Sequence, residues 1–386
     1  MAEWQTVRLG EIVKTNQSTY SPKENWQFVN YLDTGNITMN KIDEIQYINS
    51  AKDKLPSRAR RKVKTNSIIY STVRPNQLHY GIIKEQPDNF LVSTGFTVID
   101  VDCDKAVPDF IYYALTKQEI TEQLQAIAEQ SVSAYPSIKP SDIENLELTI
   151  PDKKTQERIV SMLSSIDEKI KENNAINNNL ERQAKAIFKS WFIDFEPFSN
   201  QKPSDWSVST LGNVSIMGAG GDKPQNVSPI KTDLYQYPIY SNGLSDEGLY
   251  GFTDKPKISE ESVTVSARGT IGFVCLRHIP YVPIVRLVTL IPKTEIISAK
   301  YLYLWLKQLH ITGTGTTQQQ LTVPDFQKTE ILVPSQEIVT LFTVTVEPIF
   351  EKIWANQSEN EKLSSLRDAL LRKLMSGELD VSDIDL

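Results

Sequence analysis

Histidine and cysteine, the side chains that most often ligate metals or act as nucleophiles, are scarce in this sequence. Its 386 residues include three histidines and two cysteines. His79, His278 and His310 stand far apart, at none of the spacings that metal ligands show, so no metal site is predicted. Cys103 and Cys275 lie in unrelated contexts and are expected to be buried thiols rather than a disulfide.

Enzyme motifs are also missing. The chain has no G-x-x-x-x-G-K-[ST] phosphate loop, no G-x-S-x-G nucleophile elbow and no N-P-P-Y-type methyltransferase tetrapeptide. The glycine-rich stretch 218–221 lacks the strand and helix that flank a dinucleotide-binding loop, and we interpret it as a turn. These absences predict a binding protein with no catalytic residues and no cofactor of its own.

Long apolar runs are absent too. The sequence has no stretch of about 18 apolar residues, the length needed to cross a bilayer. Residues 1–10 are too polar for a signal peptide. We therefore expect a cytoplasmic protein. Its net charge of −7 argues at first sight against a nucleic-acid partner. Screening limits the reach of distant charges to about 10 Å, however, so local clusters of charge decide the question.

What the sequence does contain is a duplicated helical pattern. Between residues 159 and 191 apolar or asparagine positions recur at alternating steps of four and three, the spacing of a coiled-coil seam. Adding 183 to each number gives an equivalent series between residues 342 and 374. The predicted seam residues are Ile159, Leu163, Ile166, Ile170, Asn173, Asn177, Leu180, Ile187, Ile349, Ile353, Asn356, Asn360, Leu363 and Leu370.

The paired asparagines give these seams a further meaning. They sacrifice apolar burial at the same places in both copies, which predicts a fixed register between the two helices. The first helix has to run from one globular half to the other, and the second has to run back, so facing seams must be antiparallel. Pro348 predicts a kink or an interruption of the second helix near Glu347.

The regions before the two helices also repeat. Short strands rich in Val, Ile, Thr and Tyr are predicted over residues 67–73, 90–101, 262–266 and 284–291, and helices over 108–129 and 298–310. The prediction is an α+β fold with two similar domains, 1–150 and 198–333, each with a small curved sheet. Two long antiparallel coiled-coil helices, 151–197 and 334–386, join them in a pseudo-two-fold arrangement.

One cluster of charge runs against the acidic balance of the chain. Seven bases stand between residues 52 and 64 with a single acid, Asp53, among them. Such a cluster suits DNA phosphates, although a solvated loop is the alternative. The bases are Lys52, Lys54, Arg58, Arg60, Arg61, Lys62 and Lys64.

Loops with side chains suited to base readout follow in both halves. Arginine pairs with guanine, and asparagine or glutamine with adenine, through bidentate hydrogen bonds. The first half supplies Arg74, Asn76, Gln77, His79 and Tyr80, and the second supplies Ser241, Asn242, Arg268 and Thr270. A second recurrent loop, 131–138 and 314–321, adds Ser131, Ser133, Tyr135, Thr314, Thr316, Thr317, Gln318 and Gln319 for DNA contact, with a purely structural loop as the alternative.

This ordered and duplicated set of motifs resembles the specificity (S, HsdS) subunits of Type I restriction–modification systems. The resemblance rests on W-x-x-x-x-L-G at 4–10 and 206–212, G-T-T-Q-Q-Q-L at 315–321, P-x-x-x-x-Q-x-x-I at 151–159 and the L-M-S-G-E stretch at 374–378. The sequence departs from the pattern in the loop 131–138, at Val339, which stands where the first copy has Gln156, and at Pro348.

The resemblance implies a DNA-reading role. In such subunits each of two target recognition domains reads one half of a bipartite site in double-stranded DNA, and the helices act as a ruler for the gap. The subunit itself is not catalytic. It recruits two methyltransferase (M) subunits, which bind S-adenosylmethionine and methylate adenine at N6, and through them restriction (R) subunits.

Two other classes of function remain as alternatives. A coiled-coil adaptor that binds only proteins would not need the basic run or the two arginine-bearing loops. A nuclease or methyltransferase in its own right would need a cofactor or metal site, for which the sequence offers no motif.

Overall fold

The computed structural model describes residues 4–131, 135–313 and 320–381. They form two compact units, of which unit 1 comprises residues 1–172 and 360–386 and unit 2 comprises residues 173–359. Both are α+β, as the sequence predicts. None of the helices in the described ranges is long and apolar enough to span a membrane.

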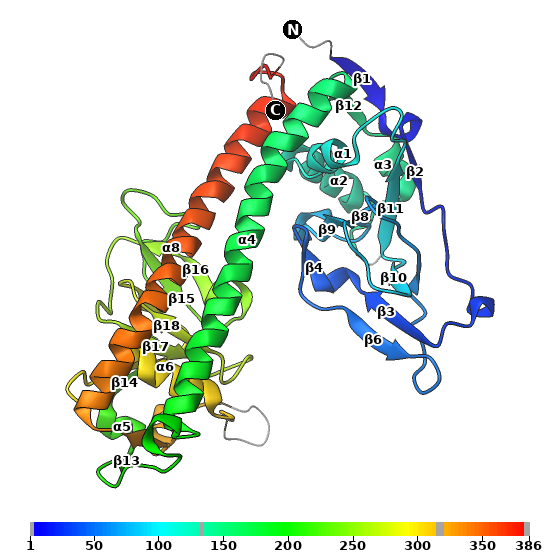
Figure 1. Cartoon of the computed structure of the whole chain (residues 1–386). Helices are drawn as coiled ribbons and strands as arrows, with labels where there is room; N and C mark the ends of the chain where they lie inside the picture. The colour runs from blue at the N-terminus through cyan, green and yellow to red at the C-terminus, as the bar shows by residue number, and fades with distance from the viewer. Residues whose placement is uncertain (1–3, 132–134, 314–319, 382–386) are drawn as a thin grey trace. The chain divides into compact units, whose positions relative to one another are not determined.

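Unit 1 contains three separate sheets and a hairpin (Figure 1). Strands β1 (Gln5–Arg8) and β12 (Glu147–Ile150) pair antiparallel, and an antiparallel sheet has the order β2 (Val13–Thr15), β11 (Phe96–Val101), β8 (Ile68–Ser71), β9 (Tyr80–Ile82). A third sheet has the order β6 (Gln46–Asn49), β3 (Phe28–Leu32), β10 (Phe90–Ser93), β7 (Ala59–Arg61), with β3 and β10 parallel. The hairpin is β4 (Ile37–Thr38) with β5 (Lys41–Ile42), and the short helices are α1 (Pro108–Leu115), α2 (Gln118–Glu129) and α3 (Pro140–Glu144).

Unit 2 repeats this plan. Strands β13 (Ser207–Thr210) and β21 (Glu330–Val333) replace β1 and β12, and the antiparallel sheet has the order β14 (Ser215–Ala219), β20 (Val288–Pro292), β17 (Ser262–Val265), β18 (Val274–Arg277). A smaller sheet has the order β16 (Leu249–Thr253), β15 (Tyr237–Tyr240), β19 (Val282–Pro283), again with one parallel pair, β15 and β19. The short helices are α5 (Leu211–Val214), α6 (Ala299–Gln308) and α7 (Val323–Phe326). The matching strand orders confirm two similar domains.

Two long helices, α4 (Lys153–Phe192) and α8 (Gln336–Met375), each have 40 residues. Asp152 caps α4 by accepting hydrogen bonds from the amide and the hydroxyl of Thr155, at 3.1 and 2.8 Å. Beyond the end of α8, Gly377 takes a φ of 74°, the left-handed conformation that commonly ends a helix. The sequence signals at both places are therefore used as helix boundaries.

Pro348 lies inside α8 without interrupting it, so of the kink or interruption predicted near Glu347 the interruption does not occur. Its side chain is on the exposed face of the helix, where the missing amide leaves a carbonyl that solvent can reach. In the turns before it, the hydroxyls of Thr340, Thr343 and Thr345 donate to the carbonyls four residues earlier, at 2.7–2.8 Å. Continuous packing of the opposite face holds the helix together.

Within each unit the two helices run antiparallel. In unit 2 Asn173 bonds to Glu359 and Asn177 to Asn356, so α4 ascends in number as α8 descends. In unit 1 Asp167 pairs with Arg367 at 3.0 Å. Within unit 2, Figure 1 shows parts of the green α4 and the orange α8 side by side.

The helix ends enter the domain cores, and this widens the buried stripe beyond the predicted seam. In unit 2 Phe188 and Phe192, 0% and 1% exposed, pack on Tyr301 and Phe342, whereas the predicted seam residue Ile187 is only half-buried. A helix that contacts a globular domain as well as another helix needs a broader apolar face than a coiled coil. The remaining seam residues are buried or half-buried, in keeping with the pattern.

Gln156 explains one difference between the copies. Its side chain is 1% exposed, donates to the Pro151 carbonyl at 2.9 Å and accepts from the Val107 amide at 2.9 Å, which ties α4 to the start of α1. Val339, at the equivalent place in α8, is also buried, at 2% exposure. The second copy therefore uses apolar packing where the first uses an amide clamp.

Several sequence predictions need correction. The strand expected over 284–291 begins only at Val288, because Val285 and Arg286 form a turn with positive φ. The strand expected over 90–101 and the helix over 108–129 are each split in two. Both cysteines are free, as expected, but Cys103 is exposed and only Cys275 is buried.

Candidate nucleic-acid interface

The basic run of unit 1 does not form one uniform patch. Lys52, Lys54 and Arg58 are exposed and have no ion pair within the described part of the chain. They lie in or beside the connection between β6 and β7, the two edge strands of their sheet. These three are the basic residues of the run whose charged groups are accessible to a phosphate.

The other four bases of the run are more engaged. Lys62 pairs with Glu24 and lies 5.1 Å from the centre of the Trp26 ring, and the Lys64 ammonium is 3.8 Å from Asp100. Arg60 and Arg61 are half-buried in or beside β7. Burial lowers the pKa of Arg61, whose Nε has no hydrogen-bond partner among the described residues.

The loop between β8 and β9 presents Arg74, which is exposed and has a φ of 49°. Its amide donates to the Pro136 carbonyl at 3.0 Å, and its guanidinium carbon lies 5.2 Å from the centre of the Tyr135 ring. Tyr135 is 60% exposed, so the pair forms a flat, open, cationic surface. Asn76 and Gln77 follow in a short exposed turn.

His79 and Tyr80, predicted in the same loop, turn towards the protein. His79 Nδ1 is 2.6 Å from the Ile37 carbonyl. Tyr80 is 4% exposed and stacks on Tyr70 with ring centres 5.5 Å apart. Burial raises the pKa of Tyr80 to about 12. Tyr80 is therefore a core residue, and the prediction that it contacts DNA is wrong.

The second loop of unit 1 is only partly described. Ser131 is half-buried, and its hydroxyl accepts a hydrogen bond from the Ser137 amide at 3.3 Å. Ile138, at the end of the loop, donates to the Thr72 carbonyl at 2.8 Å, next to Arg74. The predicted contact Ser133 lies outside the described residues.

In unit 2 the loop between β17 and β18 presents Arg268, which is exposed and donates to the Gln320 side chain at 3.0 Å. Thr270 is half-buried, and its hydroxyl has no partner among the described residues. The predicted contacts Thr314, Thr316, Thr317, Gln318 and Gln319 lie outside the described residues.

Ser241 and Asn242 hold backbone rather than offer free groups. The Ser241 amide donates to the Gly248 carbonyl at 2.8 Å. The Asn242 side chain accepts from the Ala267 amide and donates to the Val285 carbonyl, both at 2.7 Å. Val285 and Arg286, which the sequence predicts to be part of a strand, are exposed beside it.

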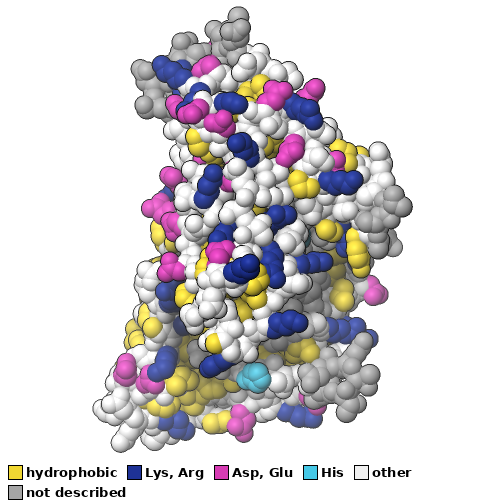
Figure 2. Space-filling view, turned by 90° about the vertical axis from the view of Figure 1, so that its right-hand side faces the viewer, with side chains coloured by type: hydrophobic (Ala, Val, Ile, Leu, Met, Phe, Trp, Pro, Cys, Tyr) yellow, Lys and Arg dark blue, Asp and Glu magenta, His cyan; other side chains and the backbone are white. Residues whose placement is uncertain are grey.

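The distribution of charge on one face is visible in Figure 2. Dark-blue Lys and Arg side chains lie on this face among uncharged ones, together with magenta Asp and Glu side chains. A chain with a net negative charge can therefore still present basic surface to a polyanion, because salt screens the more distant acidic residues.

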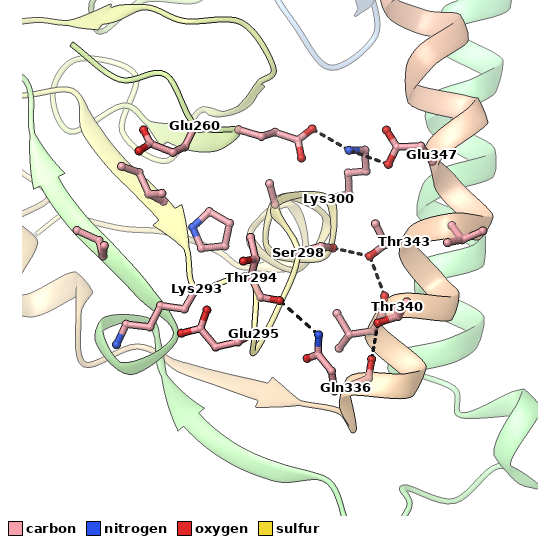
Figure 3. A pocket seen from close by; sticks show the side chains of 17 residues that line it. Glu260, Lys293, Thr294, Glu295, Ser298, Lys300, Gln336, Thr340, Thr343 and Glu347 are labelled. Carbon is pink, nitrogen blue, oxygen red and sulfur yellow. Dashed lines mark hydrogen bonds and ion pairs between the residues drawn. The ribbon is translucent and has the colours of Figure 1, made fainter.

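A cavity of about 730 Å³ lies in unit 2 against α6 and α8 (Figure 3). The Lys300 ammonium, on a side chain that is 5% exposed, lies between Glu261 and Glu347 at 2.7 and 3.0 Å. The hydroxyl oxygens of Thr343 and Ser298 are 2.8 Å apart, and Gln336 donates to the Thr294 carbonyl at 3.3 Å. The described chain contains no cluster of three metal-ligating side chains. These contacts brace the helix against the domain.

Comparison with known proteins identifies the family. The profile of the family described as "Type I restriction modification DNA specificity domain" matches residues 1–182 and again 203–362. The two matches cover most of the chain and reproduce its internal duplication. The chain belongs to this family.

Individual relatives agree with the assignment. The HindI specificity subunit of Haemophilus influenzae is 29% identical, over 98% of this chain and all of the relative. The MjaIX specificity subunit of Methanocaldococcus jannaschii is 26% identical, over 73% of this chain and 71% of the relative. The crystal structure of a Type I S subunit from M. genitalium has the same fold, with a TM-score of 0.58, 18% identity, and 97% of this chain and 96% of that chain covered.

Membership in the family also settles the enzyme question. The relatives are specificity subunits, and catalysis in these systems is carried out by partner subunits. The chain is thus a non-catalytic specificity subunit without a catalytic cofactor of its own. The relatives give no support to the adaptor alternative.

Proposed function

We propose that this specificity subunit directs a Type I restriction–modification complex to a bipartite DNA site, and that each unit reads one half of it. The observation that carries the proposal is an exposed arginine in the same hairpin of both copies. Arg74 follows β8 in unit 1, and Arg268 follows β17 in unit 2. Arginine is the side chain most often used to recognise guanine in the major groove.

The proposed contacts fall into two groups. Lys52, Lys54 and Arg58 would hold phosphates, because they are exposed and unpaired in the described structure. Around the arginine loops, Arg74, Asn76, Gln77 and Arg268 would read base edges. The loop residues 133, 314 and 316–319 stay predictions from the sequence alone.

We assign the role of ruler to α4 and α8. The predicted seam of the first helix, from Ile159 to Trp191, rises about 48 Å at 1.5 Å per residue. Half-sites centred at this separation would be about 14 base pairs apart. Buried asparagines in the seam support a fixed register, which a ruler requires.

The partners in this proposal are two methyltransferase subunits and, through them, restriction subunits. The methyltransferase subunits would bind S-adenosylmethionine and methylate adenine at N6, in the cytoplasm. We place their docking on the outer faces of the helix pair and the adjoining domains. Leu341 and Val344, 53% and 65% exposed, give α8 an apolar outer face opposite its buried Phe342 and Val346.

The test is to express the chain with its methyltransferase partner in a host without adenine methylation and to map N6-methyladenine across the genome. We expect one bipartite motif with a constant gap. A chain that acts only as an adaptor would give no motif. The purified complex would then show no affinity for DNA that falls with salt concentration.

A further inference from the structure

A tight turn at residues 284–287 of unit 2 carries unusual residues. The Leu287 amide donates to the Ile284 carbonyl at 3.0 Å, and the two residues between them, Val285 and Arg286, have φ of 51° and 60°. Two consecutive positive φ angles are the pattern of a type I′ turn, which Asn-Gly and Asp-Gly favour. A β-branched valine is among the residues least suited to this conformation.

The surrounding backbone holds the turn in place. The amides of Val285 and Arg286 donate to the carbonyls of Gly221 and Gly220, both at 2.9 Å. A Cβ on Gly220 would lie 2.7 Å from the Ile284 carbonyl oxygen, so only glycine permits this approach. The glycine-rich stretch 218–221 thus binds the backbone of this turn rather than a nucleotide.

Asn242 joins the turn to the arginine loop. Its side-chain amide accepts from Ala267, next to Arg268, and donates to the carbonyl of Val285, both at 2.7 Å. One amide group therefore fixes the spacing between two exposed segments. Asn242 acts as a positioning residue, and both ends of its amide are occupied.

The turn exposes one cation and one apolar group. Val285 is 51% exposed, and Arg286 is exposed, with no hydrogen bond or ion pair from its guanidinium group to any described residue. Arginine matches the acceptors O6 and N7 of guanine, and an apolar side chain contacts the methyl group of thymine. A phosphate contact would use the arginine but would give the valine no role.

The equivalent turn of unit 1 shows that the fold does not need this strain. There Thr94 and Gly95 connect β10 to β11, and neither has a positive φ. The turn still lies beside the arginine loop, because the Thr72 amide donates to the Gly95 carbonyl at 2.8 Å. Strain without a structural need is a mark of functional sites.

We propose that the turn Val285–Arg286 reads bases in the half-site of unit 2, with Arg286 on a guanine and Val285 on a neighbouring thymine methyl. The inference rests on the proposed DNA-reading function and adds to it a pair of specificity-determining residues. It also assigns to Asn242 the task of holding this turn and Arg268 in one reading surface.

The test replaces the strained pair by the sequence that the turn prefers. The double variant Val285→Asn/Arg286→Gly relieves the backbone strain, so its melting temperature should equal or exceed that of the unaltered chain. In the complex with the methyltransferase partner, we expect methylation to lose about tenfold or more of its discrimination at one or two positions of one half-site. The other half-site and the gap stay the same.

Two further variants sharpen the test. Arg74→Gly should relax the opposite half-site, which shows that each change acts through its own unit. Lys328→Ala removes an exposed cation from unit 2, at 78% side-chain exposure, and should leave the motif unchanged.

The outcomes separate cleanly. An unchanged motif with the double variant overturns the inference alone, as does a lower melting temperature. A uniform loss of affinity for all sequences, with a weaker salt dependence, would identify a phosphate contact and also overturn base reading. If the unaltered complex yields no bipartite motif, the proposed function fails, and this inference fails with it.

Discussion

Asn356 on α8 donates a hydrogen bond of 2.8 Å to the side-chain oxygen of Asn177 on α4. The two side chains are 1% and 8% exposed, in a stripe that is otherwise mainly apolar. Asn177 in turn donates to the Ile353 carbonyl at 3.4 Å. A one-step slip of either helix would separate these groups inside the apolar interior, so the pair selects a single register.

Replacing one asparagine of this pair should lower the free energy of unfolding more than replacing both. Asn356→Leu leaves the Asn177 amide buried with a lost partner, and we expect about 1–3 kcal/mol lower free energy of unfolding. The double variant Asn177→Leu/Asn356→Leu should recover most of this loss, because neither polar group then remains. Urea denaturation of the unaltered chain, Asn177→Leu, Asn356→Leu and the double variant measures the coupling between the two side chains. Equal, additive losses would contradict a specific pair.

The stability of unit 2 should depend on pH through His278. Its ring stacks on Trp354 with centres 4.1 Å apart. Burial, together with the charges of Lys300 and Arg277, lowers the pKa of His278 from 6.5 to about 4. As pH falls below 6.5, His278 is protonated in the unfolded chain, but in the folded chain it stays neutral until about pH 4. The free energy of unfolding therefore decreases as pH falls from 6.5 to about 4.

The measurement is the free energy of unfolding between pH 7.5 and 5, where carboxylates stay mostly ionised. We expect it to be constant above pH 6.5 and to decrease below it. His278→Phe keeps an aromatic ring on Trp354 and should flatten the decrease. A variant with the same slope as the unaltered chain would exclude His278 as the cause.

The exposed apolar face of α8 can be tested by charge. Val344→Asp places a carboxylate in the proposed docking surface, on a side chain that is 65% exposed, so folding should change by less than about 0.5 kcal/mol. Binding to the methyltransferase subunit should weaken at least about tenfold, measured by titration calorimetry. Unaltered binding by Val344→Asp would place the partner elsewhere.

The ruler predicts that helix length and DNA gap change together. Inserting one heptad into α4 and one into α8, opposite each other, should lengthen the pair by about 10 Å. The methylated motif should then gain about three base pairs in its gap while both half-sites keep their sequences. A longer chain with an unchanged gap, or with altered half-sites, would refute the ruler.

The long helices were the part of the fold most open to prediction. Their periodicity, the cap at Asp152 and the glycine at 377 are local signals that the folded chain uses. Arg367 is different, because it is a charged residue between the predicted seam residues Leu363 and Leu370, where the first copy has Ala184. The structure shows why it fits: its guanidinium pairs with Asp167 at 3.0 Å, and Tyr113 donates to the same carboxylate at 2.7 Å. Partners from three elements cannot be read from spacing.

The candidate interface was predicted less well, for physical reasons. Residue type shows what a side chain can bind but not which way it points, and so Tyr80 was misplaced into a loop although it stacks in the core. Val285 carries the composition of a strand, and only its positive φ reveals a turn. Tertiary contacts through Gly220 and Asn242 impose that conformation against local preference.

The division of the chain into units has a consequence for synthesis. Unit 2 is one continuous stretch, whereas unit 1 needs residues 360–386 as well as 1–172. Leu374, Met375 and Val381, at most 4% exposed, fill its core. At about 5–20 residues per second, a ribosome spends roughly 10–40 s on residues 173–359 before it reaches the segment 360–386 that completes this core. The unit whose synthesis begins first is therefore the last to be complete, and it must keep an open core shielded until then.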